Sequence, residues 1–150
     1  MVRRMVSIML TTATLAGCAS QPKPAPNSRA RVTFNTLAPS RGAIVAFSDV
    51  ITADLSYEIF DFSAGAKYLL MPLFDTVDGH HSTHPDWPHG VTSLTAASGS
   101  VRVSYRLADA WSEPKIARPF KVQFTVMKMT SATAGDPLGQ SETITYMTAP

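Results

Sequence analysis

The chain has 150 residues, of which 13 are Lys or Arg, 11 are Asp or Glu, and one is Cys. A single cysteine excludes an internal disulfide, and the near balance of charge leaves no basic surplus of the kind that binds nucleic acid. We therefore expect no nucleic-acid partner. The length predicts one domain of ordinary size.

The first 17 residues have the three parts of a secretory signal. Arg3 and Arg4 give a positive start, residues 5–16 are uncharged and largely apolar, and small residues stand at the end. The apolar stretch is shorter than the roughly 20 residues that a membrane-spanning helix needs. The segment 1–17 therefore predicts export followed by removal of the signal.

The lone cysteine stands at the predicted cut site, in the order Leu15-Ala16-Gly17-Cys18. This order resembles the lipobox of bacterial lipoproteins. The resemblance implies cleavage before Cys18 by the lipoprotein signal peptidase and a thioether-linked diacylglycerol on Cys18, usually with a further acyl chain on the new amino terminus. The alternative is an ordinary secretory signal with a chance cysteine. Because residues 1–17 hold two basic and no acidic residues, the mature chain carries equal numbers of each.

Residues 18–29 form a predicted tether between the lipid and the domain. Within it, residues 21–28 hold Pro22, Pro24 and Pro26 in alternation with other residues, which favours an extended stretch that reaches roughly 25–30 Å at about 3 Å per residue. The alternative is simple disorder. Residue 19 is Ala, not the Asp that tends to retain enterobacterial lipoproteins at the inner membrane. We therefore expect an outer-membrane anchor facing the periplasm, with the outer face of the cytoplasmic membrane as the alternative.

Apolar residues recur at every second position in two segments, which is typical of half-buried strands. In residues 100–107 the apolar face is Val101, Val103, Tyr105 and Leu107; in residues 118–128 it is Phe120, Val122, Phe124 and Val126. Weaker signals predict further strands at 31–35, 43–47, 56–62, 67–74, 91–97 and 142–148. No stretch has a helical stripe.

Glycines and prolines separate these segments, among them Gly135, Pro137 and Gly139. About seven or eight short strands with such turns predict an all-β domain over residues 30–150. We expect an antiparallel β-sandwich of immunoglobulin-like architecture, with a small β-barrel as the alternative.

All histidines of the chain lie in residues 80–89, beside acidic side chains in a loop rich in Gly and Pro. Neutral imidazole binds zinc, copper and nickel, so the loop is a candidate metal site. Its predicted ligands are His80, His81, His84, His89, Asp78 and Asp86. The alternative is a solvated loop without a physiological metal.

Enzyme signatures are missing from the sequence. It has no Gly-x-Ser-x-Gly elbow, no Gly-rich phosphate loop and no His-Glu-x-x-His motif. We therefore expect no catalytic residues and, apart from Zn, Cu or Ni, no cofactor. The sequence favours an envelope lipoprotein that binds or scaffolds another protein. The alternative is a metal-binding lipoprotein that uses the His-rich loop 78–90.

Overall fold

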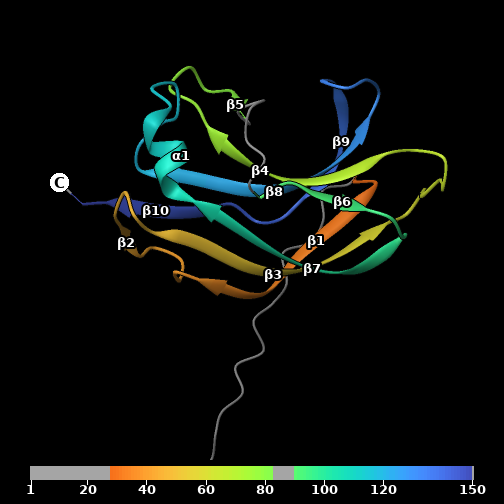
Figure 1. Cartoon of the computed structure of the whole chain (residues 1–150), viewed down its shortest axis with the longest axis horizontal. Helices are drawn as coiled ribbons and strands as arrows, with labels where there is room; N and C mark the ends of the chain where they lie inside the picture. Colours follow the sequence, from red (N-terminus) through yellow and green to blue (C-terminus); the bar gives the residue numbers. More distant parts are fainter. Residues whose placement is uncertain (1–27, 83–89, 150) are drawn as a thin grey trace, which may run out of the picture.

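The computed structural model describes residues 28–82 and 90–149 (Figure 1). Nearly every element is a strand. In chain order they are β1 (Ala30–Ala38), β2 (Ile44–Val45), β3 (Val50–Ile59), β4 (Tyr68–Asp75), β5 (His81–Ser82), β6 (Thr92–Leu94), β7 (Ser98–Arg106), α1 (Leu107–Ser112), β8 (Phe120–Met129), β9 (Gly135–Gln140) and β10 (Ile144–Thr148). None of the helices in the described ranges is long and apolar enough to cross a membrane.

The first sheet has three antiparallel strands in the order β1-β3-β7. Its central strand, β3, follows period two, because successive side chains of a pleated strand point to opposite faces. Ile51, Ala53, Leu55 and Tyr57 are buried, and the residues between them face outward and are polar. One face of this sheet is therefore core and the other is solvent-exposed.

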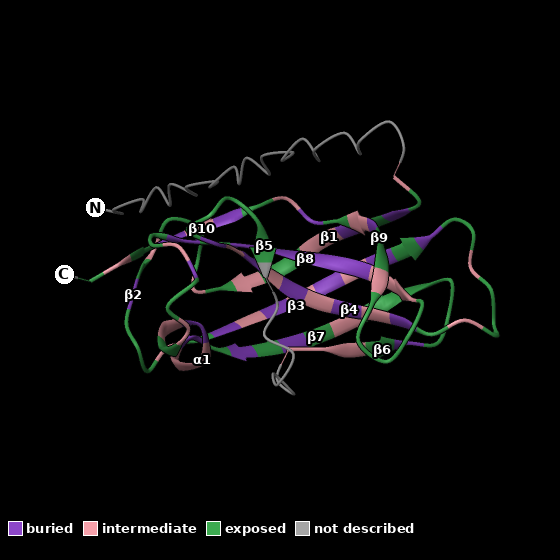
Figure 2. Cartoon of the chain, turned by 90° about the horizontal axis from the view of Figure 1, so that it is seen from above, coloured by how far each residue is buried: buried purple, intermediate pink, exposed green. Residues whose placement is uncertain are grey.

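The second sheet has the order β2-β10-β8-β4-β5, with β6 added to β4 and β9 added to β8. Its pairs are antiparallel except for the short parallel pair of β2 and β10. Tyr68, Leu70 and Phe74 of β4 face the core, as does the alternating apolar face of β8. The buried faces of the two sheets pack against each other and form the core (Figures 1 and 2).

Aromatic side chains join the two sheets across the core. The rings of Phe34 on β1 and Phe124 on β8 are 5.8 Å apart, and those of Phe74 on β4 and Tyr105 on β7 are 5.1 Å apart. The predicted all-β sandwich is confirmed. The alternative small barrel is wrong, because the strands form two separate sheets that do not close on each other.

The chain enters the sandwich at the start of β1. The backbone N–H of Arg29 donates to the carbonyl of Leu138 on β9 (2.8 Å), and Arg29 forms an ion pair with Asp61 (3.9 Å). Gly139 lies so close to this segment that a Cβ would stand 2.0 Å from the carbonyl oxygen of Ala30. The start of β1 is therefore packed directly against β9.

Two elements differ from the sequence-based expectation. Leu107, assigned to the end of a strand, begins the six-residue helix α1, in which Leu107 and Ala110 are buried. Residues 135–140, assigned to a turn, form β9. Glycine and proline are tolerated there because β9 pairs with β8 alone among the described strands, and this pairing contains a register shift between Val126 and Met127.

Smaller differences concern strand ends. The segment predicted at 56–62 is the second half of the longer β3, and residues 60–62 lie beyond its end. The strand predicted at 43–47 is only the two residues of β2, because the chain turns at residues 47–49.

Candidate functional site

The His-rich loop begins with a tight hairpin between β4 and β5. The N–H of Thr76 donates to the carbonyl of His80 (2.9 Å), and the N–H of Gly79 donates to the carbonyl of Thr76 (3.0 Å). Gly79 has φ +82°, a left-handed conformation that suits glycine. A turn followed by a left-handed glycine is a common three-residue hairpin connection. The Asp78-Gly79 pair therefore fixes where β5 folds back on β4.

The carboxylate of Asp78 serves this turn. The Thr76 hydroxyl donates to it, and the backbone N–H of His80 lies 3.5 Å from it. The Thr76 hydrogen bond, followed by contacts with His80, holds the pKa of Asp78 below its ordinary value. This carboxylate is therefore committed to the turn.

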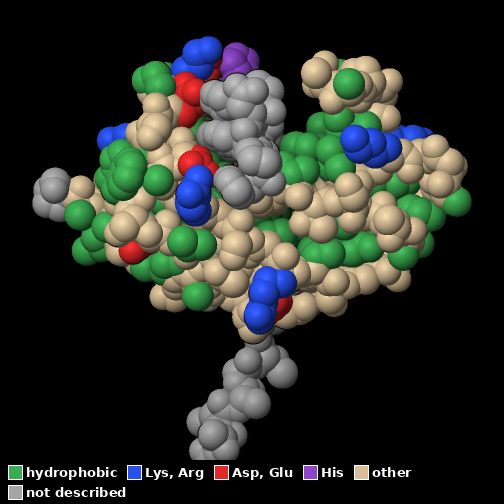
Figure 3. Space-filling model, in the orientation of Figure 1, with side chains coloured by type: hydrophobic (Ala, Val, Ile, Leu, Met, Phe, Trp, Pro, Cys, Tyr) green, Lys and Arg blue, Asp and Glu red, His purple; other side chains and the backbone are tan. Residues whose placement is uncertain are grey.

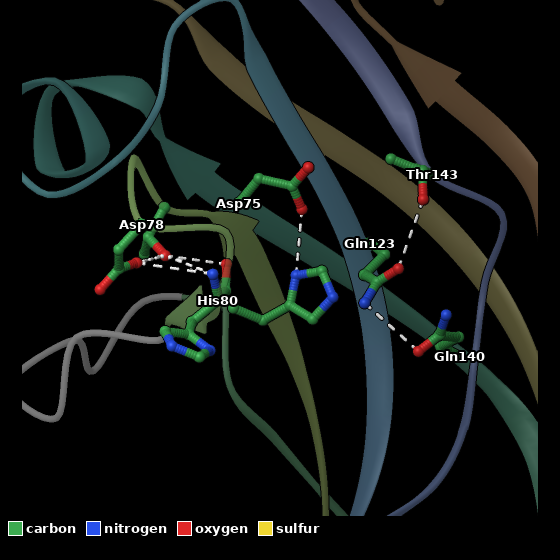
Figure 4. Close-up of polar contacts among 8 residues, drawn as sticks. Asp75, Asp78, His80, Gln123, Gln140 and Thr143 are labelled. Carbon is green, nitrogen blue, oxygen red and sulfur yellow. Dashed lines mark hydrogen bonds and ion pairs between the residues drawn. The ribbon is translucent and has the colours of Figure 1, made fainter.

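A carboxylate that the sequence analysis did not single out meets a histidine instead. Asp75 and His81 are paired across β4 and β5, and His81 Nδ1 lies 3.0 Å from Asp75 Oδ1 (Figure 4). When Nδ1–H donates to a carboxylate, the lone pair of Nε2 is directed away and free to bind a metal. Half of the His81 side chain is exposed. The hairpin register would have identified Asp75 from the sequence. Thr76 pairs with His80, so the preceding residue, Asp75, lies opposite His81.

The predicted six-residue metal site is therefore only partly visible. Of its members, Asp78, His80 and His81 are described, whereas His84, Asp86 and His89 lie outside the described residues, as does Cys18. Within residues 28–82 and 90–149, no three His, Cys, Asp or Glu side chains are placed to hold a metal ion. The structure brings together one pair, Asp75 and His81.

A second polar cluster lies nearby on β8 and is structural. Gln123 is 3% exposed; its Nε2 donates to Gln140 Oε1 (3.2 Å), and its Oε1 accepts from the Thr143 hydroxyl (3.3 Å) (Figure 4). These bonds satisfy both ends of a buried amide and join β8 to the chain that leads from β9 to β10. Neither amide nor the Thr143 hydroxyl carries a charge.

The exposed large hydrophobic side chains gather at one end of the sandwich. Among the described residues they are Ile44, Phe47, Val50, Phe60, Val77 and Met147, and all but Phe60 lie at the end where β1 finishes and β10 finishes. Figure 3 shows hydrophobic side chains at that end, on the left, and others over the right half of the face in view.

Three of these end residues, together with the partly buried Trp111 of α1, form two neighbouring pairs that we call the distal patch: Ile44, Phe47, Trp111 and Met147. Ile44 and Met147 are register neighbours on β2 and β10 and are 73% and 48% exposed. The ring of Phe47, 54% exposed, meets Trp111 of α1 edge-on at 6.4 Å.

Arg118 fixes the indole of the patch. Its guanidinium carbon lies 4.9 Å from the centre of the Trp111 ring, and its Nη2 donates to the Trp111 carbonyl (2.7 Å). The indole also meets the buried Phe120 ring edge-on, with the ring centres 5.2 Å apart. Trp111 is therefore held in place before any partner arrives.

Comparison with known proteins gives no family for the chain. No family and no curated protein matches it. A similar solved structure is the alkylpurine DNA glycosylase AlkC of Pseudomonas fluorescens, bound to DNA containing an abasic site analog. It is 14% identical, with a TM-score of 0.43, over 80% of this chain and 31% of that chain. Similarity this distant gives no functional argument.

Proposed function

We propose that this protein is an envelope lipoprotein, anchored by lipid on Cys18, that binds a partner protein through the distal patch. The observation that carries the proposal is where the patch lies relative to the start of the domain. β1 begins where the chain enters and ends at the patch side, and nine strand residues at about 3.3 Å each separate the two ends by roughly 30 Å. An anchor preceding residue 28 would hold the patch away from its membrane.

This placement favours a protein over the anchoring bilayer as the occupant of the patch. Trp and Arg are enriched among the residues that dominate binding energy at protein interfaces, and Trp111 with Arg118 supplies such a pair. The exposed rings and aliphatic chains of Phe47, Ile44 and Met147 would be buried on docking. Because Arg118 and Phe120 already hold the Trp111 side chain in place, less side-chain entropy is lost when the partner binds.

The proposal is tested by crosslinking in cells. A photoreactive phenylalanine analogue placed at Phe47 is expected to give a discrete protein adduct, which mass spectrometry identifies. The matched control is the same analogue at Phe60, which has nearly the same exposure but lies at the other end.

The complex is then reconstituted from the purified proteins. We expect Phe47→Ser to weaken binding at least tenfold and Phe60→Ser to leave it within twofold. Equal adducts at both positions, or a complex insensitive to Phe47→Ser, would reject the patch as the interface.

A metal-binding function remains the second candidate, and the Asp75–His81 pair favours it. A carboxylate that orients an imidazole is the usual outer partner of a metal-bound histidine. Further ligands must complete the set, because these two do not suffice for Zn²⁺, Cu²⁺ or Ni²⁺.

Calorimetry of the untagged mature chain with each ion tests this second function. We expect one-to-one binding that is lost in His81→Ala, weakened about 10- to 100-fold in Asp75→Asn, and retained when Asp78→Asn removes the turn carboxylate. Weak binding that survives His81→Ala would leave the pair a structural feature of the hairpin.

A further inference from the structure

The outer face of the three-stranded sheet has a hollow of about 400 Å³ at the end where the chain enters. All three strands line it. The residues that matter are Arg31 and Thr33 of β1, Ser56 and Glu58 of β3, and Ser98 and Ser100 of β7. The surface dips here because the outward side chains of β7, Ser98 and Ser100, are short, ending one atom beyond Cβ; Gly99 between them faces inward, where a Cβ would meet the Tyr57 ring.

The lining is polar and has no net charge. Arg31 Nη1 lies 3.6 Å from Glu58 Oε2, so the one positive and the one negative side chain oppose each other across β1 and β3. The remaining polar side chains are hydroxyls, each able to donate and to accept a hydrogen bond. The Ser56 hydroxyl lies 3.2 Å from that of Ser100, which fixes both at the floor of the hollow.

An exposed aromatic ring borders the same region. Phe60 is 52% exposed, and its ring centre lies 5.8 Å from the guanidinium carbon of Arg31. It is the one large exposed hydrophobic side chain, among those described, that lies away from the other end of the sandwich. A ring here offers a flat apolar surface beside a group of hydroxyls.

These features together select the chemistry of a ligand. An apolar molecule would leave these polar groups without partners, and a polyanion would meet no net positive charge, because Arg31 is balanced by Glu58. A neutral sugar chain matches both features. Its hydroxyls can form hydrogen bonds with the serine, threonine, carboxylate and guanidinium groups, and the C–H face of a sugar ring can pack on the aromatic ring. The hollow is shallow and open, which suits a segment of a polymer better than a small molecule that must be enclosed.

We propose that this hollow binds a neutral glycan strand. The site lies at the opposite end from the distal patch and is independent of it. A single domain could therefore hold a glycan and a protein at the same time.

The test uses the full chain, purified in a detergent without a sugar headgroup, and two soluble probes, the hexamers of N-acetylglucosamine and of glucose. Titration calorimetry is expected to show saturable binding of at least one of them. Binding of the first alone indicates amide-bearing strands of the kind found in cell-wall glycan. Binding of the glucose hexamer indicates another neutral polysaccharide.

A matched pair of substitutions on β7 locates the site. Ser100→Val fills the floor of the hollow, whereas Ser104→Val makes the same change farther along the same face, where Ser104 contacts Thr52 (3.4 Å). Valine favours strands, so both variants are expected to fold. We expect Ser100→Val to weaken hexamer binding at least tenfold and Ser104→Val to change it less than twofold.

Three results would overturn the proposal. They are no saturable binding of either hexamer, equal losses in the two valine variants, and tighter binding of an acidic polysaccharide of the same length. The Phe47 crosslinking experiment does not involve this face, so either proposal can fail without the other.

Discussion

Arg102 holds the carboxylate of Asp54 from two sides: its Nε donates to Oδ1 (2.7 Å) and its Nη2 donates to Oδ2 (2.8 Å). The two residues are register partners on β3 and β7, on the outer face of the three-stranded sheet. The Thr36 hydroxyl of β1 donates to the same carboxylate. One polar row therefore crosses all three strands, and a bidentate pair of this kind fixes geometry as well as charge.

The first prediction concerns the pH dependence of folding stability. The Arg102 hydrogen bonds, followed by that from Thr36, lower the pKa of Asp54 to about 2. A carboxyl whose pKa is lower in the folded state stabilises the fold above its unfolded pKa and loses this effect as pH falls through its folded pKa. We expect Asp54→Asn to lower the free energy of unfolding at pH 7, with the difference from wild type shrinking between about pH 4 and pH 2.

Urea unfolding at pH 7, 4, 3 and 2 measures this difference. The exposed guanidinium is screened by salt, so the effect is expected to be smaller in 1 M NaCl. A difference that stays constant down to pH 2 would show that the ionised carboxylate is not its source.

The second prediction concerns the aromatic core. Phe74 is fully buried and lies between the rings of Tyr105 and Phe120, at 5.1 and 6.2 Å. Removing such a ring loses both its transfer free energy and the packing around it, so Phe74→Ala is expected to cost about 3–5 kcal/mol. Phe60→Ala, at a half-exposed position whose ring forms a cation–π pair with Arg31, is the control and is expected to cost no more than about 1 kcal/mol. Equal unfolding free energies for the two variants would contradict the core assignment.

The third prediction concerns the contact between β9 and the start of β1. A Cβ on Gly139 would collide with the carbonyl of Ala30, a backbone atom that a side-chain rotation cannot move. We expect Gly139→Ala to destabilise the domain by about 1–3 kcal/mol. Gly65→Ala is the control, because nothing lies within 4 Å of a Cβ there. Thermal unfolding of the two variants makes the comparison, and a neutral Gly139→Ala would mean that β9 does not pack on the start of the chain.

The fourth prediction concerns the anchor. If Cys18 carries lipid, Cys18→Ser is expected to abolish incorporation of a labelled fatty acid and to leave the signal uncleaved by the lipoprotein peptidase. Ala19→Ser, a change of similar size next to it, is expected to preserve labelling. Mass spectrometry of the mature amino terminus reads both effects. An unmodified Cys18 in the wild-type protein would favour an ordinary secretory signal.

Period two in the sequence was enough to predict the faces of the strongest strands. Val103 and Tyr105 of β7 and the alternating apolar residues of β8 are buried as expected. This pattern is local, because it follows from the pleat of a single strand and needs no knowledge of its neighbours. The turn at Asp78-Gly79 is also a local signal, because the left-handed backbone conformation at this position favours glycine.

The period-two pattern did not predict the structure where contacts with another strand or with the core decide it. β9 contains glycine and proline and becomes a strand only because β8 offers it an edge. Leu107 continues the alternation of β7, yet the chain turns into α1 so that Leu107 and Ala110 can both be buried. In each case a tertiary contact outweighs the local preference.

The sequence by itself determined the all-β class, the faces of the main strands, and the expectation of a signal and a lipidated cysteine. Each of these follows from residues that are close together in the chain. Only the tertiary structure brought Ile44 to Met147, and β1, β3 and β7 around one polar hollow. These sites depend on which strands pair and in what register, and that is set by how the whole core packs.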